Sequence, residues 1–380
     1  MKIAMIGHKR IPSREGGIEI VVEEISTRLA ARGHTVHVYN RKGNYVHGSG
    51  NEYRRIKEYK GVKIIHIPTV TVKGLDALVY SFFAVIRALF GRYDVIHFHA
   101  EGPGVMILIT RLFKIKSVAT VHGLDWQRAK WGNLARKYIR YGEKVIANMA
   151  DEVIVLSSNN QKYFSDNYSR KTNFIPNGVS KPNIRKASLI TEKYGLHGHD
   201  YLLFLSRLVP EKGLDYLIDA FNPIKTNIKM VIAGGSSHSN EYEVKVKGKA
   251  ANDSRIILTG FVEGELLEEL FSNCTAYILP SDIEGMPISL LEAMSYGCSC
   301  LISNIPENTE VAGDFAMTFK KADTADLQEK LECILNRGFN AHTPDEISAY
   351  ILKKYNWDKV VDSHLMVYNN NNDIEAVYSG

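Results

Sequence analysis

The sequence predicts an α/β protein with two parallel sheets in tandem, and three observations lead to this class. Short apolar runs alternate with amphipathic helical patterns, which is typical of parallel strands covered by helices. The alternation restarts after a cluster of turn residues between Pro176 and Pro182, which predicts a domain boundary there. The 380 residues suffice for two or three domains, and 45% hydrophobic with 23% charged residues excludes a disordered or collagen-like chain.

In the first half, a helix is predicted over Ile18–Arg32. Its apolar side chains recur at helical spacing up to Leu29, and Gly33 follows as a C-cap. The predicted strands of this half are Lys2–Ile6, Thr35–Tyr39, Val62–Ile67, Val95–Phe98, Ser117–Val121 and Glu152–Leu156.

The second half repeats this rhythm, with helices predicted over Gly213–Phe221 and Glu265–Phe271. The predicted strands are Tyr201–Leu205, Lys229–Ala233, Ile256–Leu258, Ala276–Leu279 and Ser299–Ser303. Ligands of such sheets bind outside the carboxyl ends of the strands, so the loops after those ends are the places to look for chemistry.

The net charge of +5 conceals an asymmetry between the two halves. Residues 1–180 carry 28 Lys and Arg against 14 Asp and Glu, a net +14, whereas residues 181–380 carry a net −9. A basic half attracts phosphates, anionic lipid headgroups or nucleic acid. The basic residues are spread over several elements with no recognised nucleic-acid module, so no nucleic-acid partner is expected.

Two stretches decide the expected compartment. The apolar window Leu75–Phe90 is interrupted by Asp76 and Arg87 and is too short to span a bilayer. The N-terminal apolar run is too short for a signal peptide, so a cytoplasmic location is expected. The four cysteines all follow residue 273 and suggest neither a disulfide framework nor a metal cluster.

The loop after the first strand ends in Gly16-Gly17, where a helix begins. It lacks G-x-G-x-x-G, which disfavours a dinucleotide-binding dehydrogenase. Unpaired amides at the helix start favour an anion, and Lys9, Arg10 and Arg14 add positive charge. The alternative is a flexible loop without a ligand.

Two further segments of the second half carry candidate binding groups. Arg207 and Lys212 directly follow a strand, and a planar guanidinium with a mobile ammonium can hold a diphosphate; solvated cations are the alternative. Pro287 suits the first turn of a helix, which places Glu284 in the preceding loop and Glu292 more than one turn inside. These carboxylates could accept from sugar or ribose hydroxyls, with a capping acid on a solvated face as the alternative; Asp282-x-Glu284 also matches a metal-holding pair.

His97-Phe98-His99 invites a metal interpretation, since both imidazoles lie on one face of a strand. No further ligand set stands at metal spacing, so these histidines are expected to line a site at the strand end, with 99–102 as an acceptor-side loop. Trp126 and Trp131 could stack on sugar rings or pack in the core.

Together these motifs resemble the family 4 retaining glycosyltransferases of the GT-B fold. The match runs from residue 1 to about 370, and the order and spacing of the motifs make it specific. They are Gly16-Gly17, Thr120-Val121-His122-Gly123, Pro176-Asn177-Gly178-Val179, Arg207 with Glu211-Lys212-Gly213, Gly234-Gly235, Gly260-Phe261-Val262 and the pair Glu284 and Glu292. The segments 5–12 and 122–128 look like the bacterial polysaccharide branch that includes rhamnosyltransferases.

The resemblance implies two Rossmann-like α/β/α domains facing across a cleft. Residues 1–178 would form the acceptor-side domain, with a C-terminal helix at about 355–372 packing back on it, and residues 179–354 the donor-binding domain. The acceptor side would include His99, Glu101, Asp125 and Trp126.

The resemblance also implies the donor contacts. Arg207 and Lys212 would bind the donor diphosphate, Glu292 the ribose and Glu284 the transferred sugar, with His122 facing that sugar; the catalytic set is therefore His122, Arg207, Lys212 and Glu284. The other implied donor-binding residues are Gly16, Gly17, Gly234, Phe261, Val262, Gly285, Met286 and Pro287.

The implied reaction is a retaining, metal-independent hexosyl transfer without a cofactor. The donor would be TDP-rhamnose or a UDP-hexose, and the acceptor a saccharide, lipid-linked at the inner face of the membrane, in capsule or exopolysaccharide synthesis. The basic half and Leu75–Leu89 could contact an anionic membrane, unless that segment is a covering helix. A sugar-nucleotide 2-epimerase and a non-catalytic nucleotide-sugar-binding subunit are the alternatives.

Overall fold

The structure is a computed structural model of the chain, and it describes residues 1–42, 56–70, 72, 74–128, 130–235, 240–337 and 341–370. Two compact units make up the chain. Unit 1 contains Met1–Gly178 and the C-terminal segment from Trp357, and unit 2 contains Val179–Asn356. Unit 1 is therefore built from both ends of the sequence.

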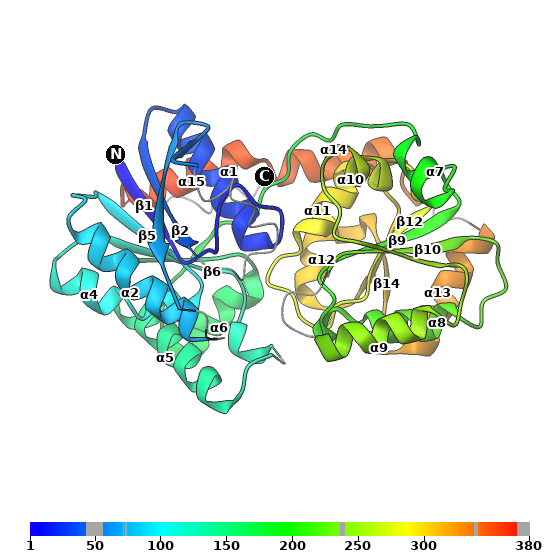
Figure 1. The fold of residues 1–380 in the computed structure, drawn as a ribbon, viewed down its shortest axis with the longest axis horizontal. Coiled ribbons are helices and arrows are strands. Elements are labelled where there is room, and N and C mark those ends of the chain that lie inside the picture. Colours follow the sequence, from blue (N-terminus) through cyan, green and yellow to red (C-terminus); the bar gives the residue numbers. More distant parts are fainter. Residues whose placement is uncertain are drawn as a thin grey trace. The chain divides into compact units, whose positions relative to one another are not determined.

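Unit 1 is built on an eight-stranded sheet with the order β3-β4-β2-β1-β5-β6-β7-β8 (Figure 1). All neighbouring strands run parallel except β3 and β4, which are antiparallel. The strands are β1 (Lys2–Ile6), β2 (Thr35–Lys42), β3 (Glu58–Tyr59), β4 (Val62–Pro68), β5 (Val95–His99), β6 (Ser117–Val121), β7 (Glu152–Val155) and β8 (Asn173–Phe174).

Helices cover both faces of this sheet. One face packs on α2, α4, α5 and α6, whose apolar side chains share a core with β1, β5, β6 and β7. On the other face α1 contacts α15, which returns from the C-terminus. The helices are α1 (Gly17–Ala31), α2 (Leu75–Leu89), α3 (Glu101–Gly104), α4 (Ile107–Leu112), the 3-10 helix η2 (Asp125–Gln127), α5 (Asn133–Met149), α6 (Ser158–Tyr168) and α15 (Trp357–Tyr368).

Unit 2 has a six-stranded, wholly parallel sheet with the order β11-β10-β9-β12-β13-β14. The strands are β9 (Tyr201–Leu205), β10 (Lys229–Ala233), β11 (Ile256–Gly260), β12 (Ala276–Leu279), β13 (Cys300–Ser303) and β14 (Met317–Phe319). Their apolar runs are buried because helices cover both faces.

In unit 2, α8, α9 and α13 share one core with the sheet, and α10, α11 and α14 lie on the opposite face (Figure 1). The helices are α7 (Leu189–Tyr194), η3 (Pro210–Lys212), α8 (Leu214–Phe221), α9 (Asn240–Ala250), α10 (Gly264–Ser272), α11 (Ile288–Ser295), α12 (Pro306–Ala312), η4 (Gly313–Phe315), α13 (Thr324–Arg337) and α14 (Pro344–Lys354).

The two sheets, parallel apart from the β3–β4 pair, confirm the α/β class that the sequence predicts. All eleven expected strands are present with bounds within two residues, except that β2 continues three residues further, to Lys42. Strands β3, β8 and β14 were not expected. Pro287 is the N-cap of α11, one residue earlier than the predicted first helical turn. The expected C-terminal helix is α15, and residues 371 and 372 of that prediction lie outside the described part. In that part no helix is both long and apolar enough to cross a bilayer.

Candidate functional site

The loops after β9 and β10 in unit 2 are in backbone contact. A Cβ on Gly234, whose φ is +141°, would lie 1.8 Å from the carbonyl oxygen of Ser206. The Ser206 amide donates to the Ala233 carbonyl at 3.1 Å, and the Leu208 amide to the Gly235 carbonyl at 3.2 Å. Gly234 is therefore required by the close approach of two loops, one of which carries Arg207.

Lys212 and Glu284 form an ion pair at the same edge of the sheet. Lys212 ends η3 after β9, and Glu284 lies in the loop after β12. Their side chains are only 12% and 8% exposed, and the Asp282 amide donates to the Glu211 carbonyl at 2.9 Å. Two of the residues predicted to bind the donor thus meet although 72 positions separate them.

The segment from Gly285 to Pro287 is buried and leads into α11. Ser289 in the first turn of this helix is tied to β12, because the Tyr277 hydroxyl lies 2.7 Å from its Oγ. Glu292 lies one turn further along and is partly exposed. Glu284 therefore precedes the N-terminal turn of α11 along the chain, and Glu292 follows that turn.

The two residues after β11 that were predicted to flank the base, Phe261 and Val262, differ in exposure. Phe261 is 51% exposed, whereas Val262 is buried. Only the Phe261 ring is thus available for stacking on a planar ligand in this structure.

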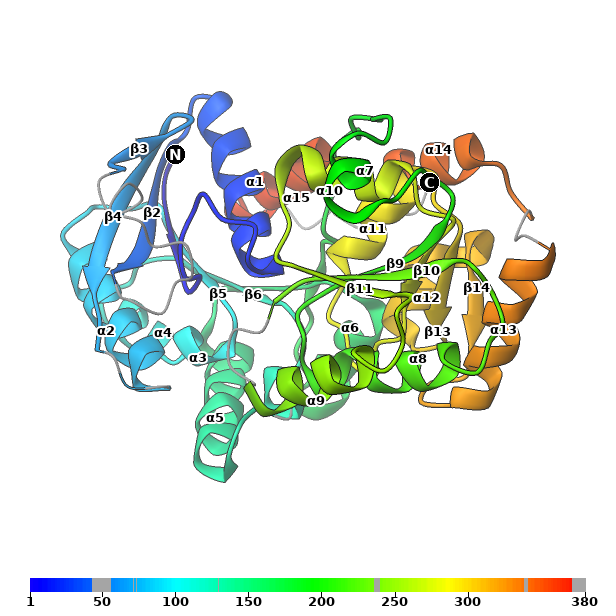
Figure 2. The same cartoon turned by 45° about the vertical axis from the view of Figure 1, so that its right-hand side comes forward.

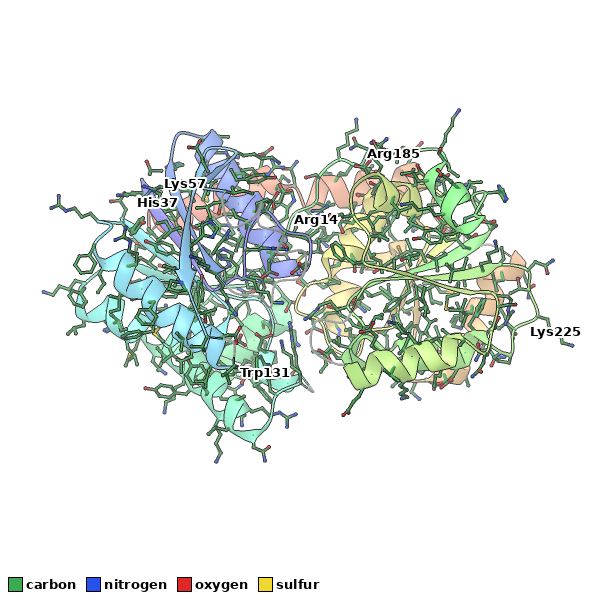
Figure 3. The ribbon with its side chains drawn as sticks, viewed as in Figure 1. Arg14, His37, Lys57, Trp131, Arg185 and Lys225 are labelled. Carbon is green, nitrogen blue, oxygen red and sulfur yellow. The ribbon has the colours of Figure 1, made fainter. Side chains whose placement is uncertain are left out.

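In unit 1, the helix start at Gly16 already has a carboxylate beside it. A Cβ on Gly16 would lie 2.4 Å from the Glu19 carboxylate, which also accepts from the Lys9 amide at 2.9 Å. Burial raises the pKa of Glu19, but the Lys9 charge and the backbone amides outweigh it and lower the pKa, so the group is ionised. Arg14 lies in the same loop (Figure 3), and the phosphate-binding role of Gly16 and Gly17 stays a prediction.

His99 and His122 are hydrogen-bonded neighbours at the carboxyl ends of β5 and β6. His99 Nδ1 lies 3.0 Å from His122 Nε2, and the rings stack with their centroids 5.3 Å apart. Burial lowers the pKa of His122 to about 4 and that of His99 well below its usual range. Both imidazoles are therefore neutral at pH 7, and the His99 side chain has no exposed surface.

Two histidines behind this pair extend it into the core of unit 1. The His97 ring packs on the His99 ring with centroids 4.2 Å apart. The centroid of the His364 ring on α15 lies 5.7 Å from that of His97. His97 is held by the Tyr368 hydroxyl at 2.8 Å and the Thr120 hydroxyl at 2.7 Å. Sequence reasoning singled out His97 but missed His364 and Tyr368, since these contacts span more than 260 residues.

The segment that carries Asp125 and Trp126 is anchored by two buried carboxyl groups. Glu101 accepts from the Asp125 amide at 2.9 Å, and Glu143 on α5 accepts from the Trp126 indole N–H at 3.0 Å. Glu143 also accepts from Tyr163 at 2.8 Å, a role that no sequence motif indicated. Burial raises the pKa of Glu101 well above its usual range, and the nearby Asp125 charge adds to this.

The described residues contain no group of three or more His, Cys, Asp or Glu side chains arranged to hold a metal ion. Within the described residues, His97 and His99 therefore have no third side chain placed to complete a metal site. Asp282, the other candidate ligand, accepts from the Tyr216 hydroxyl at 3.2 Å. The histidines of this part of unit 1 are neutral hydrogen-bonding groups of its core.

Two family models of glycosyltransferases match the chain, one in each unit. The family model described as Glycosyltransferase Family 4 matches residues 15–181, and the model described as Glycosyl transferases group 1 matches residues 187–354. The chain belongs to the family 4 glycosyltransferases. This family 4 glycosyltransferase acts in glycan biosynthesis. One model covers unit 1 except for residues 1–14 and the C-terminal segment from Trp357, and the other covers almost all of unit 2.

Three relatives illustrate the range of the family. An uncharacterized glycosyltransferase of Methanocaldococcus jannaschii is 25% identical, covering 82% of this chain and 86% of its own. The UDP-Gal:alpha-D-GlcNAc-diphosphoundecaprenol alpha-1,3-galactosyltransferase of Escherichia coli is 26% identical over 65% of this chain and 67% of its own. A GDP-mannose-dependent phosphatidylinositol monomannoside mannosyltransferase of Mycolicibacterium smegmatis is 25% identical over 75% and 76%.

Solved structures place this glycosyltransferase in the GT-B fold. Sucrose-phosphate synthase from Thermosynechococcus elongatus superposes with a TM-score of 0.81 at 20% identity, covering 97% of this chain and 98% of its own. Anabaena HepE in complex with UDP and glucose superposes with a TM-score of 0.79 at 17% identity, covering 97% and 100%. At these identities the likeness concerns the fold alone.

Proposed function

We propose that this glycosyltransferase is a retaining hexosyltransferase that uses a nucleotide-diphosphate sugar and a saccharide acceptor. The observation that carries the proposal is the position of Lys212 and Glu284, paired in two loops at the carboxyl edge of the unit 2 sheet, with Arg207 in the first of these loops. A diphosphate bound by Lys212 and a sugar hydroxyl bound by Glu284 would replace this ion pair. Glu292 would hold the ribose, and Phe261 would flank the base.

In the proposed reaction the bond between the sugar C1 and the diphosphate oxygen breaks, and a bond from C1 to the acceptor oxygen forms on the same face. The acceptor proton passes to the departing phosphate oxygen. Arg207 and Lys212 stabilise the charge that develops on the diphosphate, so neither a metal ion nor a further cofactor is required. Glu284 binds the sugar and is not a nucleophile, because no covalent intermediate is needed.

The donor and acceptor classes rest on the relatives. The name of the Escherichia coli galactosyltransferase specifies UDP-Gal as donor and a diphosphoundecaprenol-linked acceptor. This relative favours a UDP-hexose donor and a lipid-linked saccharide acceptor here. TDP-rhamnose is the other donor that we propose, on the resemblance of residues 5–12 and 122–128 to the rhamnosyltransferase branch. The product would be a capsule, exopolysaccharide or other cell-surface glycan.

Thermal-shift measurements with UDP-, TDP-, GDP- and ADP-sugars test the donor site. A donor at 100 times its dissociation constant should add about 2.7 kcal/mol of stability. Arg207→Ala and Lys212→Ala should lose the shift. Arg185→Ala and Lys225→Ala are matched controls on other loops of unit 2 and should keep it (Figure 3).

A transfer assay with the donor so identified tests the reaction. Retention is read from the anomeric configuration of the product by NMR, and addition of EDTA tests metal independence. Donor isomerisation without an acceptor would instead establish an epimerase. Donor binding with neither reaction would establish a non-catalytic subunit.

A face of unit 1 supports a peripheral contact with an anionic membrane at the cytoplasmic side. Helices α2 and α4 are in contact (Figures 1 and 2). Phe82 and Phe83 of α2, Phe90 directly after it and Leu112 of α4 are exposed. Exposed arginine and lysine side chains lie in and next to the same helices: Arg87, Arg92, Arg111 and Lys114. Apolar side chains among cations match a lipid surface with anionic headgroups.

Sedimentation with vesicles tests this contact. Vesicles containing phosphatidylglycerol should bind the protein more than pure phosphatidylcholine vesicles do, and salt should weaken the binding. Phe82→Ser with Phe83→Ser should reduce binding, whereas Ile184→Ser, at an even more exposed apolar residue of unit 2, should not. Equal binding to both lipids would contradict the contribution of charge to membrane binding. If the protein instead self-associates and the double variant does not, the face is an interface between protein copies.

A further inference from the structure

We propose that His99 is a positioning residue that holds His122 as the Nδ1–H tautomer, so that His122 presents a hydrogen-bond donor to the transferred sugar. The ligand named here rests on the proposed function. The tautomer does not, because it follows from contacts inside unit 1.

The contact between the two rings allows only two arrangements. His99 Nδ1 and His122 Nε2 are 3.0 Å apart, and both rings are neutral, so one of these nitrogens carries the hydrogen and the other accepts it. If His99 donates, the proton of His122 resides on Nδ1. If His122 donates, its Nδ1 is a bare acceptor and the proton of His99 resides on Nε2.

The buried end of His99 distinguishes the two arrangements. Its Nε2 is buried and has no hydrogen-bond partner among the residues that the structure describes. The second arrangement would place an N–H group there, and orphaned N–H groups are rarer in folded proteins than under-satisfied acceptors. The first arrangement leaves only a lone pair, so we infer that His99 donates to His122.

The neighbours of His99 hold its ring in this position. The His97 ring packs on it with a centroid distance of 4.2 Å, and both His97 nitrogens are occupied by the hydroxyls of Tyr368 and Thr120. His97 therefore offers no hydrogen bond to His99. A Cβ on Gly7 would lie 2.1 Å from the His99 carbonyl oxygen, which shows how closely the backbone of β5 is packed at this point.

The inferred tautomer limits what His122 can do. Its Nε2 accepts from His99 and its Nδ1 carries a hydrogen, so the neutral ring has no lone pair left for a substrate proton. His122 is then a donor to a sugar hydroxyl or phosphate oxygen and not a general base. This agrees with transfer of the acceptor proton to the departing phosphate.

NMR of the full chain with ¹⁵N-labelled histidine reads the tautomer without any ligand or activity. Protonated and bare ring nitrogens give separate resonances, and His122→Gln assigns the His122 signals among the thirteen histidines. We expect a protonated Nδ1 and a bare Nε2 at pH 7.5. A protonated Nε2 on His122 would overturn the proposal.

Two substitutions of His99 separate positioning from packing. The amide of His99→Asn can donate from the place of Nδ1 and should preserve the His122 tautomer, whereas His99→Leu removes the donor and should allow Nε2–H. Retention of Nδ1–H alone in a folded His99→Leu would contradict the role of His99. If His99→Leu does not fold, the wild-type and His99→Asn spectra still decide the question.

Kinetics then test the ligand contact. His122→Asn keeps a donor near the position of Nδ1, while His122→Gln places it near Nε2, so kcat should be about tenfold higher for the asparagine variant. Equal kcat values, or a higher value for glutamine, would refute the contact with sugar. If no transfer reaction is found, the proposed function fails while the spectra still report the tautomer.

Discussion

Lys212 and Glu284 form an ion pair, so removing either side chain leaves the other without its counter-charge. Both are largely buried, so Lys212→Ala should lower the free energy of unfolding by about 1–3 kcal/mol in addition to abolishing donor binding. Lys245→Ala breaks the exposed pair with Asp215 and should cost about 0.5 kcal/mol or less. Thermal denaturation followed by circular dichroism measures both.

Neutralising both partners provides the decisive control. Lys212→Met with Glu284→Gln removes the pair without leaving a buried charge, so it should be more stable than Lys212→Ala while still failing to bind donor. Methionine also keeps the volume of the lysine stem, so a double variant as unstable as Lys212→Ala would show that the unpaired Glu284 charge is not what destabilises the single variant.

His364 makes the stability of unit 1 depend on pH. Burial lowers its pKa to about 4 from 6.5, so below pH 6.5 the unfolded chain binds a proton that the folded chain does not. Its contribution to the free energy of unfolding should therefore fall by about 1.4 kcal/mol per pH unit between pH 6.5 and 4. Urea titrations of wild type and His364→Asn at pH 7.5, 6.5 and 5.5 measure this slope.

The expected result is a slope that is shallower in His364→Asn by that amount, with a constant difference between the two proteins above pH 6.5. The remaining slope persists in both proteins, because burial lowers the pKa of His8, His37 and His122 to about 4 and that of His97 and His99 well below the usual range. Identical slopes would mean that His364 is protonated in the folded chain.

At this scale the sequence reveals residues that stand in motifs and misses those that act through space. The loops after two strands single out Lys212 and Glu284, and the family resemblance singles out His122. Glu19 and Glu143 were not, because a buried carboxylate on a helix looks in the sequence like any solvated acid. Its role becomes visible only when the Lys9 amide or the Trp126 indole is found beside it.

Among the elements, the turn after β10 offers a test with a neighbouring control. Gly234 has φ +141°, and a Cβ there would meet the Ser206 carbonyl, whereas a Cβ on Gly235 would meet nothing within 4 Å. Gly234→Ala should lower the free energy of unfolding by about 1–3 kcal/mol and weaken donor binding by moving the Arg207 loop. Gly235→Ala should change stability by about 0.5 kcal/mol or less.

Chemical denaturation and donor titration of both variants distinguish strain from a ligand contact. Weak donor binding by Gly235→Ala at full stability would show that the ligand itself needs the glycine there. Equal stability of the two variants would contradict the close approach of the loops.

Strand predictions succeeded where burial on both faces produces continuous apolar runs, as in β1, β6, β9, β10 and β12, whose bounds match. The two-residue strand β8 and the edge strand β14 are too short or too exposed to give such a run. Pairing with a neighbouring strand defines them, and a single sequence does not display that pairing.

For the whole molecule, the distribution of tryptophan allows the units to be followed separately. Trp126, Trp131 and Trp357 all belong to unit 1, and the chain has three tryptophans in total. Tryptophan fluorescence therefore reports the unfolding of unit 1, while circular dichroism reports both units. Because residues 357–380 carry one Lys against four Asp or Glu, unit 1 has a net charge of +11 and unit 2 a net charge of −6, so the two units keep the charge asymmetry of the two halves.

Helix α15 brings the end of the chain back to unit 1, so a substitution in its buried face should affect unit 1 and not unit 2. Val361 is fully buried, while Asp362, its neighbour, is exposed and pairs with Arg32 on α1. Val361→Asp places an unpaired charge in the core and should unfold unit 1 at a markedly lower temperature by fluorescence. The unit 2 transition seen by circular dichroism should persist, since its core contains no residue of α15. Asp362→Ala should leave both transitions within a few degrees of wild type. A joint collapse of both transitions in Val361→Asp would show instead that the two units fold as one cooperative body.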